Sequence, residues 1–209
     1  TMLKQKSVAN TIYDIILNMV PIDELEDHHI KDTLPWLKSG VPIFRIAKPN
    51  IPDKHLVSYF VLFDQNASKI LLVDHKKAVL WLPSGGDVEI DENPKDAVVR
   101  ECFEELGINA NFLYTDPIFL TSTITVGLTA GHTDVSLWYV LRGDHRHEYK
   151  FDTDEFYTIK WFGLDEIPYE RADPHMHRFI NKLLGCEIKI KDMQRQEASR
   201  LIKSEILDE

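Results

Sequence analysis

Cysteine, long apolar runs and positive charge are all scarce in this sequence. With only Cys102 and Cys186 among 209 residues, a disulfide framework is not expected, and we predict a protein of the reducing cytoplasm. No stretch of about 18 apolar residues occurs, so the sequence predicts no transmembrane helix. No apolar run follows a basic segment, as it would in a signal peptide. We therefore expect no membrane partner.

The charge balance is acidic. Asp and Glu number 34 against 24 Lys and Arg, which gives a formal net charge of -10. Such a charge argues against non-specific binding to nucleic acid or to anionic membranes, because their phosphates attract basic surfaces. The hydrophobic share of 44% and the charged share of 28% are ordinary for a soluble globular protein.

The chain divides into three predicted segments. Residues 1–50 form an N-terminal helical extension, whose role as a substrate lid, a dimer contact or a packing element stays open. Residues 51–185 form the main domain, and residues 186–209 a C-terminal helix. Strands are expected at 56–63, 69–73, 78–82, 119–126, 133–141 and 159–162, and later helices at 173–184 and 194–206. Strands on both sides of a central helix predict the α/β class, with a mixed sheet between helical layers.

A well-marked helix is predicted after residue 93. Asn93 is a suitable N-cap, Pro94 suits the first helical position, and Gly107 suits the left-handed residue after the last turn. Ahead of the helix, residues 82–86 are predicted to form a loop, with two glycines that let the backbone approach a ligand closely. Apolar residues inside the helix have the i, i+3, i+4, i+7 spacing of a core-facing stripe, and they are Val99, Cys102, Phe103 and Leu106.

The same helix carries three glutamates on one face. Glu101, Glu104 and Glu105 stand at i, i+3 and i+4, and at about 100° per residue they point roughly opposite the predicted apolar stripe. Carboxylates crowded in this way repel one another, and a divalent cation is the simplest group that turns the repulsion into attraction. For these residues taken alone, a solvated acidic face is the alternative. Arg100 lies beside them and can pair with a carboxylate.

The full spacing of residues 86–108 resembles the Nudix box of the Nudix hydrolases. From Gly86 the pattern is Gly, five residues, Glu, seven residues, Arg-Glu, an apolar residue, any residue, Glu-Glu, any residue, Gly and an apolar residue, and every fixed position is filled. One mild departure is Cys102, where the family usually has a larger aliphatic residue, although a thiol can serve as a small buried hydrophobe. The likeness extends over roughly residues 56–184. It implies an α/β/α sandwich in which the box is a loop–helix–loop lying over the sheet.

The resemblance also implies the chemistry of the box. Hydrolysis of a diphosphate linkage requires neutralised phosphate oxygens and an activated water, which divalent metal ions supply, and clustered carboxylates favour Mg²⁺ or Mn²⁺. Carried over by position, Glu101, Glu104 and Glu105 are the metal ligands, and Gly86 offers a backbone carbonyl. The expected catalytic residues within the box are Arg100, Glu104 and Glu105.

The general base is harder to assign. In the family it is a box glutamate or an acid from a distant loop, and residues 152–155 stand where such a loop is expected, ahead of Trp161. Glu155 is therefore the predicted base. The alternative is that Glu155 only caps or decorates its loop.

The segment 132–139, which overlaps the strand predicted at 133–141, alternates polar and apolar residues when it is extended. His132, Asp134, Ser136 and Trp138 fall on one face, which is unusually polar for a strand beside a core. These four residues are the predicted substrate-binding surface, with Trp138 available to stack on a base. The alternative is an edge strand with one solvated face. Nine histidines are present, and none shows zinc-ligand spacing.

The predicted function is a divalent-metal-dependent Nudix pyrophosphohydrolase. Its substrate is a nucleoside diphosphate linked to another moiety, such as a sugar nucleotide like ADP-ribose, or a nucleoside triphosphate, and no residue pattern selects among them. The alternatives are a non-catalytic nucleotide sensor domain and an enzyme like isopentenyl diphosphate isomerase, and both are expected to have an altered box. The predicted partner is a small nucleotide rather than nucleic acid, and a homodimer through the N-terminal extension is a further expectation.

Overall fold

A seven-stranded mixed sheet forms the centre of the molecule. The structure, a computed structural model, describes residues 7–207. Within this range the strands are β1 (Lys54–Asp64), β2 (Lys69–His75), β3 (Leu80–Leu82), β4 (Ser84–Asp87), β5 (Phe119–Ile124), β6 (Thr133–Arg142) and β7 (Phe156–Gly163). The helices are α1 (Val8–Leu17), α2 (Glu24–Lys38), α3 (Pro94–Leu106) and α4 (Met176–Leu207), with short 3₁₀ turns at Gly127–Thr129 and Tyr169–Arg171.

The pairing of the strands brings distant residues together. The order is β3-β2-β1-β6-β5, while β4 pairs with β1 and β7 pairs with β2. β1 and β6 are parallel, and their register places His55 beside Asp134 and Tyr59 beside Trp138. Because side chains alternate along a strand, residues in register share a face of the sheet. The register therefore decides which side chains of β1 and β6 meet.

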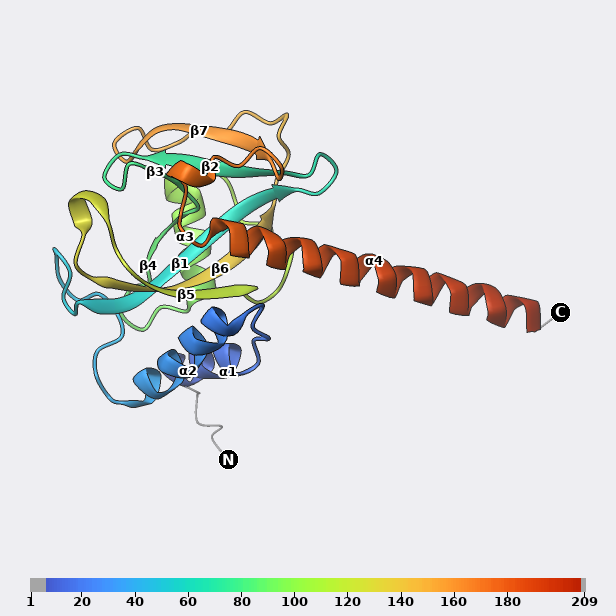
Figure 1. Ribbon diagram of the computed structural model, residues 1–209, viewed down its shortest axis with the longest axis horizontal. Helices are drawn as coiled ribbons and strands as arrows, with labels where there is room; N and C mark the ends of the chain where they lie inside the picture. Colours follow the sequence, from blue (N-terminus) through green and yellow to red (C-terminus); the bar gives the residue numbers. More distant parts are fainter. Residues whose placement is uncertain (1–6, 208–209) are drawn as a thin grey trace.

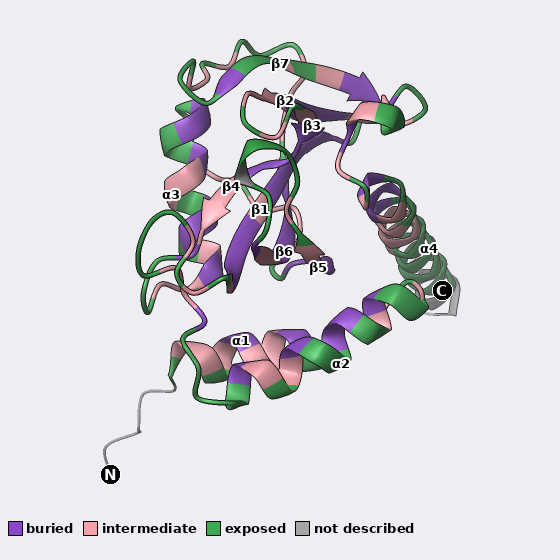
Figure 2. Ribbon diagram, turned by 60° about the vertical axis from the view of Figure 1, so that its left-hand side comes forward, coloured by how far each residue is buried: buried purple, intermediate pink, exposed green. Residues whose placement is uncertain are grey.

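Helices cover both faces of the sheet, which confirms the predicted α/β/α sandwich (Figure 1). Figure 2 shows α3 on one side of the sheet and α4 on the other, with α1 and α2 along the end formed by β5. One buried cluster joins α1, α2 and α3 to the sheet, with Ile16, Val98 and Leu137 among its members. A second cluster joins α4 to the opposite face and contains Trp138 and Phe179. None of the helices within residues 7–207 has the length and apolar character needed to cross a bilayer.

Two predicted boundaries are wrong. A loop is expected at residues 82–86, but residues 84–87 form β4, which pairs antiparallel with β1. The helices predicted at 173–184 and 194–206 are one continuous helix, α4, of 32 residues. Its interior contains no proline, and the single Gly185 weakens a helix without ending it. Figure 1 shows the second half of α4 extending away from the rest of the fold.

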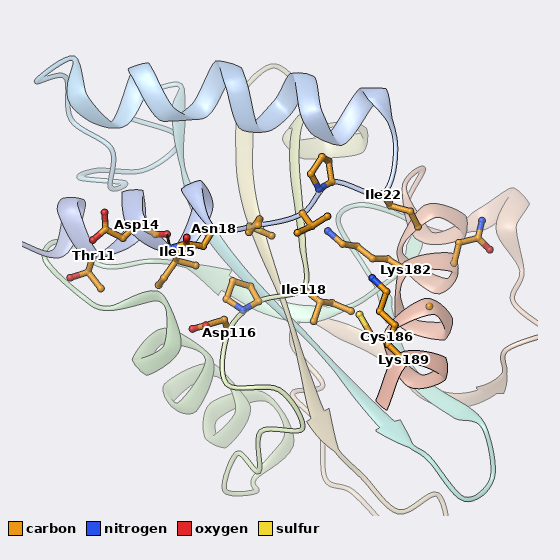
Figure 3. A pocket seen from close by; sticks show the side chains of 16 residues that line it. Thr11, Asp14, Ile15, Asn18, Ile22, Asp116, Ile118, Lys182, Cys186 and Lys189 are labelled. Atoms are coloured by element: carbon orange, nitrogen blue, oxygen red, sulfur yellow. Dashed lines mark hydrogen bonds between the residues drawn. The ribbon is translucent and has the colours of Figure 1, made fainter. Parts of the chain in front are cut away.

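One buried and one partly exposed ion pair hold the N-terminal extension against α4. The fully buried Glu26 of α2 accepts hydrogen bonds from the Leu120 amide at 3.2 Å and from the Lys182 ammonium at 2.6 Å. Asp23, the N-cap of α2, pairs with Arg178 at 2.6 Å. A cavity of about 580 Å³ lies between α1 and α4 (Figure 3), and no residue of α3 lines it. The extension therefore shares a buried core with α3, while the cavity between the extension and α4 is lined by other elements.

Candidate functional site

Local sequence signals set the ends of α3 as predicted. The Asn93 side chain accepts a hydrogen bond from the Lys95 amide at 2.9 Å, and Pro94 is the first residue of the helix. Gly107 ends the helix with a φ of 66°, in the left-handed region that glycine adopts without steric cost. The N-cap starts the helix a short loop after β4, and the helix packs beside that strand.

The predicted apolar stripe of α3 is wrong at two of its four positions. Val99 is 44% exposed and Phe103 is 65% exposed, whereas Cys102 and Leu106 are buried as expected. The helix is rotated so that Glu105, only 5% exposed, lies on the buried side. The acids therefore do not all point away from the core. The buried face consists of Pro94, Ala97, Val98, Cys102, Glu105 and Leu106.

Glu105 is drawn inward by the backbone of β4. Its carboxylate accepts a hydrogen bond from the Gly85 amide at 3.0 Å. Gly85 has a φ of 137°, and a Cβ at this position would lie 2.0 Å from the carbonyl oxygen of Ser58. Only glycine permits this approach of β4 to β1. The glycine thus allows the amide to face the buried carboxylate.

Glu101 lies against the next residue of β4. A Cβ on Gly86 would come within 2.5 Å of the Glu101 carboxylate oxygen Oε1, so the helix packs on bare backbone here. The same oxygen accepts a hydrogen bond from Arg100 Nη1 at 2.5 Å. Glu101 and Glu105 therefore approach β4 at consecutive glycines.

Arg100 ties the loop to the helix. Its Nε and Nη2 donate to both carboxylate oxygens of Glu92, each at 3.0 Å, and Nη2 also donates to the carbonyl of Asp87 at 3.1 Å. The hydrogen bonds to Glu92, followed by those to Glu101, raise the pKa of Arg100 although burial opposes them. One guanidinium thus fixes the entry to α3, the loop before it and the orientation of Glu101.

Buried negative charge gathers between α3 and β4. Burial raises the pKa of Glu101 although Arg100 opposes the shift. Burial also raises the pKa of Glu105 well above its usual range, and the charge of Glu101 adds to this effect. Arg100 compensates Glu101 more directly than Glu105, whose buried carboxylate is bonded to a neutral amide. A pair of carboxylates that lose water in this way suits a hard divalent ion, which prefers oxygen ligands.

Glu104 is arranged differently from the other two box glutamates. Its side chain is 58% exposed, and its Oε2 lies 3.5 Å from Arg100 Nη1. Of the three acids, Glu104 is the one that points outward as the helical spacing predicts. It lies where water or a ligand can reach it.

The loop that carries Glu155 lies over the same end of α3. The Asp152 amide donates to the carbonyl of Glu105 at 3.0 Å, and the Lys76 amide donates to the carbonyl of Glu155 at 3.0 Å. The charge of Glu155 contributes to the raised pKa of both Glu101 and Glu105. The structure thus brings this distant acid into the electrostatic field of the box.

The expected stacking surface on Trp138 is absent. The indole is fully buried, its ring packs against Phe119 and Phe179, and its Nε1 donates to Thr121 Oγ1 at 3.0 Å. Ser136, two residues earlier on the same face, is 2% exposed. Trp138 is consequently a core residue of the α4 side. The prediction fails because strand alternation identifies a shared face but not what covers it.

His132 and Asp134 lie on this face beside a histidine that the sequence pattern does not single out. Asp134 Oδ1 is 3.0 Å from His132 Nε2 and 3.5 Å from His55 Nε2. Burial raises the pKa of Asp134 to about 6 against the opposing pull of both histidines. His55 carries no local sequence signal because its partners lie far along the chain, on the strand that runs parallel to its own.

The chain is similar in sequence and in fold to known proteins. A family model described as NUDIX domain matches residues 54–183. A protein of Bacillus subtilis (strain 168) named putative 8-oxo-dGTP diphosphatase is 43% identical over 51 residues, which are 24% of this chain and 34% of that protein. The match therefore spans about a third of the relative's length.

Two solved structures share the fold. A MutT NUDIX hydrolase from Burkholderia pseudomallei matches with a TM-score of 0.51 and 22% identity, over 61% of this chain and 95% of the other. A MutT protein from Methanosarcina mazei Go1 matches with a TM-score of 0.50 and 20% identity, over 61% of this chain and 90% of the other. At these identities the likeness concerns the fold alone.

Proposed function

Because the chain belongs to the Nudix family, whose model matches residues 54–183, we propose that it hydrolyses a pyrophosphate bond in a nucleotide. The observation that carries the proposal is a pair of carboxylates beside β4: the half-buried Glu101, held by Arg100 against Gly86, and the buried Glu105, held by the Gly85 amide. The substrate class we propose is a nucleoside diphosphate linked to another moiety, or a nucleoside triphosphate. An intact box supports hydrolysis over a sensor or an isomerase.

The carboxylate cluster is the proposed binding place of Mg²⁺ or Mn²⁺. Glu101 and Glu105 would hold the ion, with Glu104 and the carbonyl of Gly86 completing the set. When bound, the ion supplies neutralisation of phosphate charge and a lowered pKa of water. Arg100 does not bind substrate in this scheme; it keeps Glu101 in place through its bonds to Glu92.

Proton transfer is assigned to Glu155. Its loop lies over the end of α3, and its charge acts on both Glu101 and Glu105. We propose that its carboxylate takes the proton of the attacking water. Glu155→Gln should then lower kcat and leave KM nearly unchanged. If Glu155 only caps its loop, the same substitution should lower the stability of the fold and leave kcat unchanged. Asp154→Asn, one residue away, is the matched control.

The polar face of β6 is the proposed substrate side. Asp134 is partly accessible near the beginning of the strand, whereas His132, just before the strand, is 8% exposed and Ser136, further along the same face, is 2% exposed. Trp138 lies behind them as a packing residue. Substrate contact is therefore proposed first for Asp134, and for His132 and Ser136 beside it only if substrate binding uncovers them.

A hydrolysis screen tests the function. Purified protein is incubated with Mg²⁺ or Mn²⁺ and with nucleoside triphosphates including 8-oxo-dGTP, sugar nucleotides including ADP-ribose, dinucleoside polyphosphates and CDP-alcohols. We expect metal-dependent release of products from one class, lost in folded Glu105→Gln protein. Binding of a nucleotide without turnover would instead favour the sensor function. Equal turnover by wild type and Glu105→Gln would exclude the proposed site.

A further inference from the structure

A second set of metal-ligand atoms lies on the face of β1 opposite α3. His55, His132 and Asp134 each bring one ligand atom within 4.8 Å of the others. The two imidazole rings are stacked, with centroids 5.2 Å apart. We propose that these three residues bind one divalent transition-metal ion of the zinc class, at a site separate from the box carboxylates. Ion binding here can be measured without hydrolase activity, although His132 and Asp134 are also proposed substrate contacts, so an ion bound here would lie on the proposed substrate side.

The hydrogen bonds of His55 direct its second nitrogen into the cluster. Its Nδ1 lies 2.9 Å from the carbonyl oxygen of Pro52, and because a carbonyl only accepts, Nδ1 carries the proton. In the neutral ring Nε2 then presents a lone pair. In this tautomer the buried atom makes no hydrogen bond, because its neighbours Asp87 Oδ1, 3.1 Å away, and Asp134 Oδ1, 3.5 Å away, are acceptors as well. An imidazole fixed through Nδ1 with Nε2 free is the usual arrangement of a metal ligand.

His132 is oriented in a similar way. Its Nδ1 lies 3.0 Å from the Thr125 hydroxyl, and that hydroxyl in turn donates to the His132 carbonyl at 3.2 Å. With its proton on Nδ1, the His132 ring points Nε2 at Asp134 Oδ1, 3.0 Å away. Asp134 Oδ1 is itself buried without a hydrogen bond. Three ligand atoms thus converge, and two of them lack a hydrogen-bond donor.

The charges around the cluster favour a cation. Asp134 and Asp87 both approach His55, and among residues 7–207 the permanent cation that pairs with them is Arg45, 2.6 Å from the far oxygen of Asp87. Neutral imidazoles add no charge, so a negative charge stays uncompensated in a site where His55 is fully buried. Two imidazoles with one carboxylate suit zinc and its neighbours rather than Mg²⁺. A second proton on His55 is the competing way to supply the positive charge: burial lowers the pKa of His55, but Asp87, the Pro52 carbonyl and Asp134 outweigh burial and raise it.

A second group in the chain serves as a matched control. Asp64, Asp144 and His145 also bring ligand atoms within 4.8 Å. Here the carboxylate already has hydrogen-bond donors, because Asp64 Oδ2 accepts bonds from the His145 ring at 2.7 Å and from the His145 amide at 3.0 Å. His145 is also more exposed, at 33%. We expect no tight zinc binding at this surface group.

The test is zinc titration of the full chain after treatment with a chelator. Excess Mg²⁺ is kept present so that the box carboxylates are occupied, and calorimetry and elemental analysis report binding. We expect one Zn²⁺ for each chain. His132→Gln and Asp134→Asn should each weaken its affinity by more than about 10-fold, while His145→Gln and Glu105→Gln bind as wild type does. Co²⁺ supplies a second readout, because its visible absorption in wild type should disappear in His132→Gln.

Three results would overturn the site. The first is the absence of zinc binding in wild type together with a doubly protonated His55 ring at neutral pH by NMR. The second is unchanged zinc affinity in both His132→Gln and Asp134→Asn. The third is loss of zinc binding only in Glu105→Gln, which would place the ion in the box. Circular dichroism of each variant separates a lost site from a lost fold, and Asp134→Asn, which preserves shape, serves if His132→Gln does not fold.

Discussion

The two faces of β1 carry two clusters of opposite character. On the α3 side, Glu101 and Glu105 offer oxygen atoms only; Arg100 orders Glu101, and the Gly85 amide orders Glu105. On the other side, His55 and His132 offer nitrogen, and a single carboxylate lies between them. Adjacent residues of β4 face opposite sides of the sheet, as successive residues of a strand do: Gly86 lies against Glu101 and Asp87 against His55. One short strand thus separates a site suited to a hard ion from a site suited to a softer one.

The difference shows what a charge cluster needs in order to bind a particular ion. In the box, neighbouring carboxylates repel one another, and a bound divalent ion would offset their negative charge. Because the ligands are oxygen atoms, Mg²⁺ or Mn²⁺ is favoured. In the histidine cluster, geometry selects the ion, because each ring is held by a bond at its other nitrogen. Variants that act on one cluster should therefore leave ion binding at the other unchanged.

The largest expected effect is loss of catalysis on neutralising Glu105. Glu105→Gln keeps an acceptor for the Gly85 amide and removes one negative charge from the metal site. We expect kcat to fall about 1000-fold, or about 4 kcal/mol, on the substrate found by the screen. Glu104→Gln, at an exposed position, is the matched control and should lose less. A larger loss in Glu104→Gln would make the outward acid the principal ligand.

The same substitution should stabilise the protein when no metal is present. The pKa of Glu105 is raised well above the ordinary 4.5, so between the two values the folded chain keeps a proton that the unfolded chain releases. Stability of wild type then falls as pH rises above the unfolded value, by at most about 1.4 kcal/mol for each pH unit. Glu105→Gln lacks this loss.

Thermal unfolding in chelator at several pH values measures the effect. The Tm of Glu105→Gln should exceed that of wild type by a margin that widens from about pH 5 to about pH 7. Added Mg²⁺ should close the margin by stabilising wild type alone. Parallel Tm curves for the two proteins would mean that Glu105 is ionised and compensated in the folded chain.

Replacing Arg100 by lysine should have an intermediate effect. Lysine keeps the charge but cannot bond Glu92 through two nitrogens while also reaching Glu101 and the Asp87 carbonyl. We expect kcat to fall about 10- to 100-fold, as for other residues that position metal ligands. Arg146→Lys is the control, because Arg146 makes a comparable pair with Asp144 but is 78% exposed. Equal effects in the two variants would remove any special role for Arg100.

The two clusters also differ in how far the sequence predicts them. The box is contiguous, so its residue spacing alone predicts the helix, both caps and the three acids. The rotation of α3 is not predicted, because a hydrogen bond from Gly85 outweighs the preference of Glu105 for solvent. His55 and Asp134 meet only through the parallel register of β1 and β6, a contact that no local pattern encodes. The assignment of Trp138 to the substrate fails for the same reason: its cover, α4, comes from a remote part of the chain.

The smallest expected effect on catalysis is that of replacing Trp138. It decides whether this residue, on the same face of β6 as Asp134, contacts the substrate. Trp138→Phe keeps the ring packing on Phe119 and Phe179 but removes the donor to Thr121. The lost hydrogen bond and the volume removed from the core should together cost about 2 kcal/mol and lower Tm by about 4–8 °C. KM should stay unchanged, since the indole is fully buried. Denaturant unfolding and steady-state kinetics measure the two quantities separately. A raised KM with unaltered stability would mean that substrate binding exposes this ring, and the histidine cluster would then lie at the entrance of a base-binding pocket.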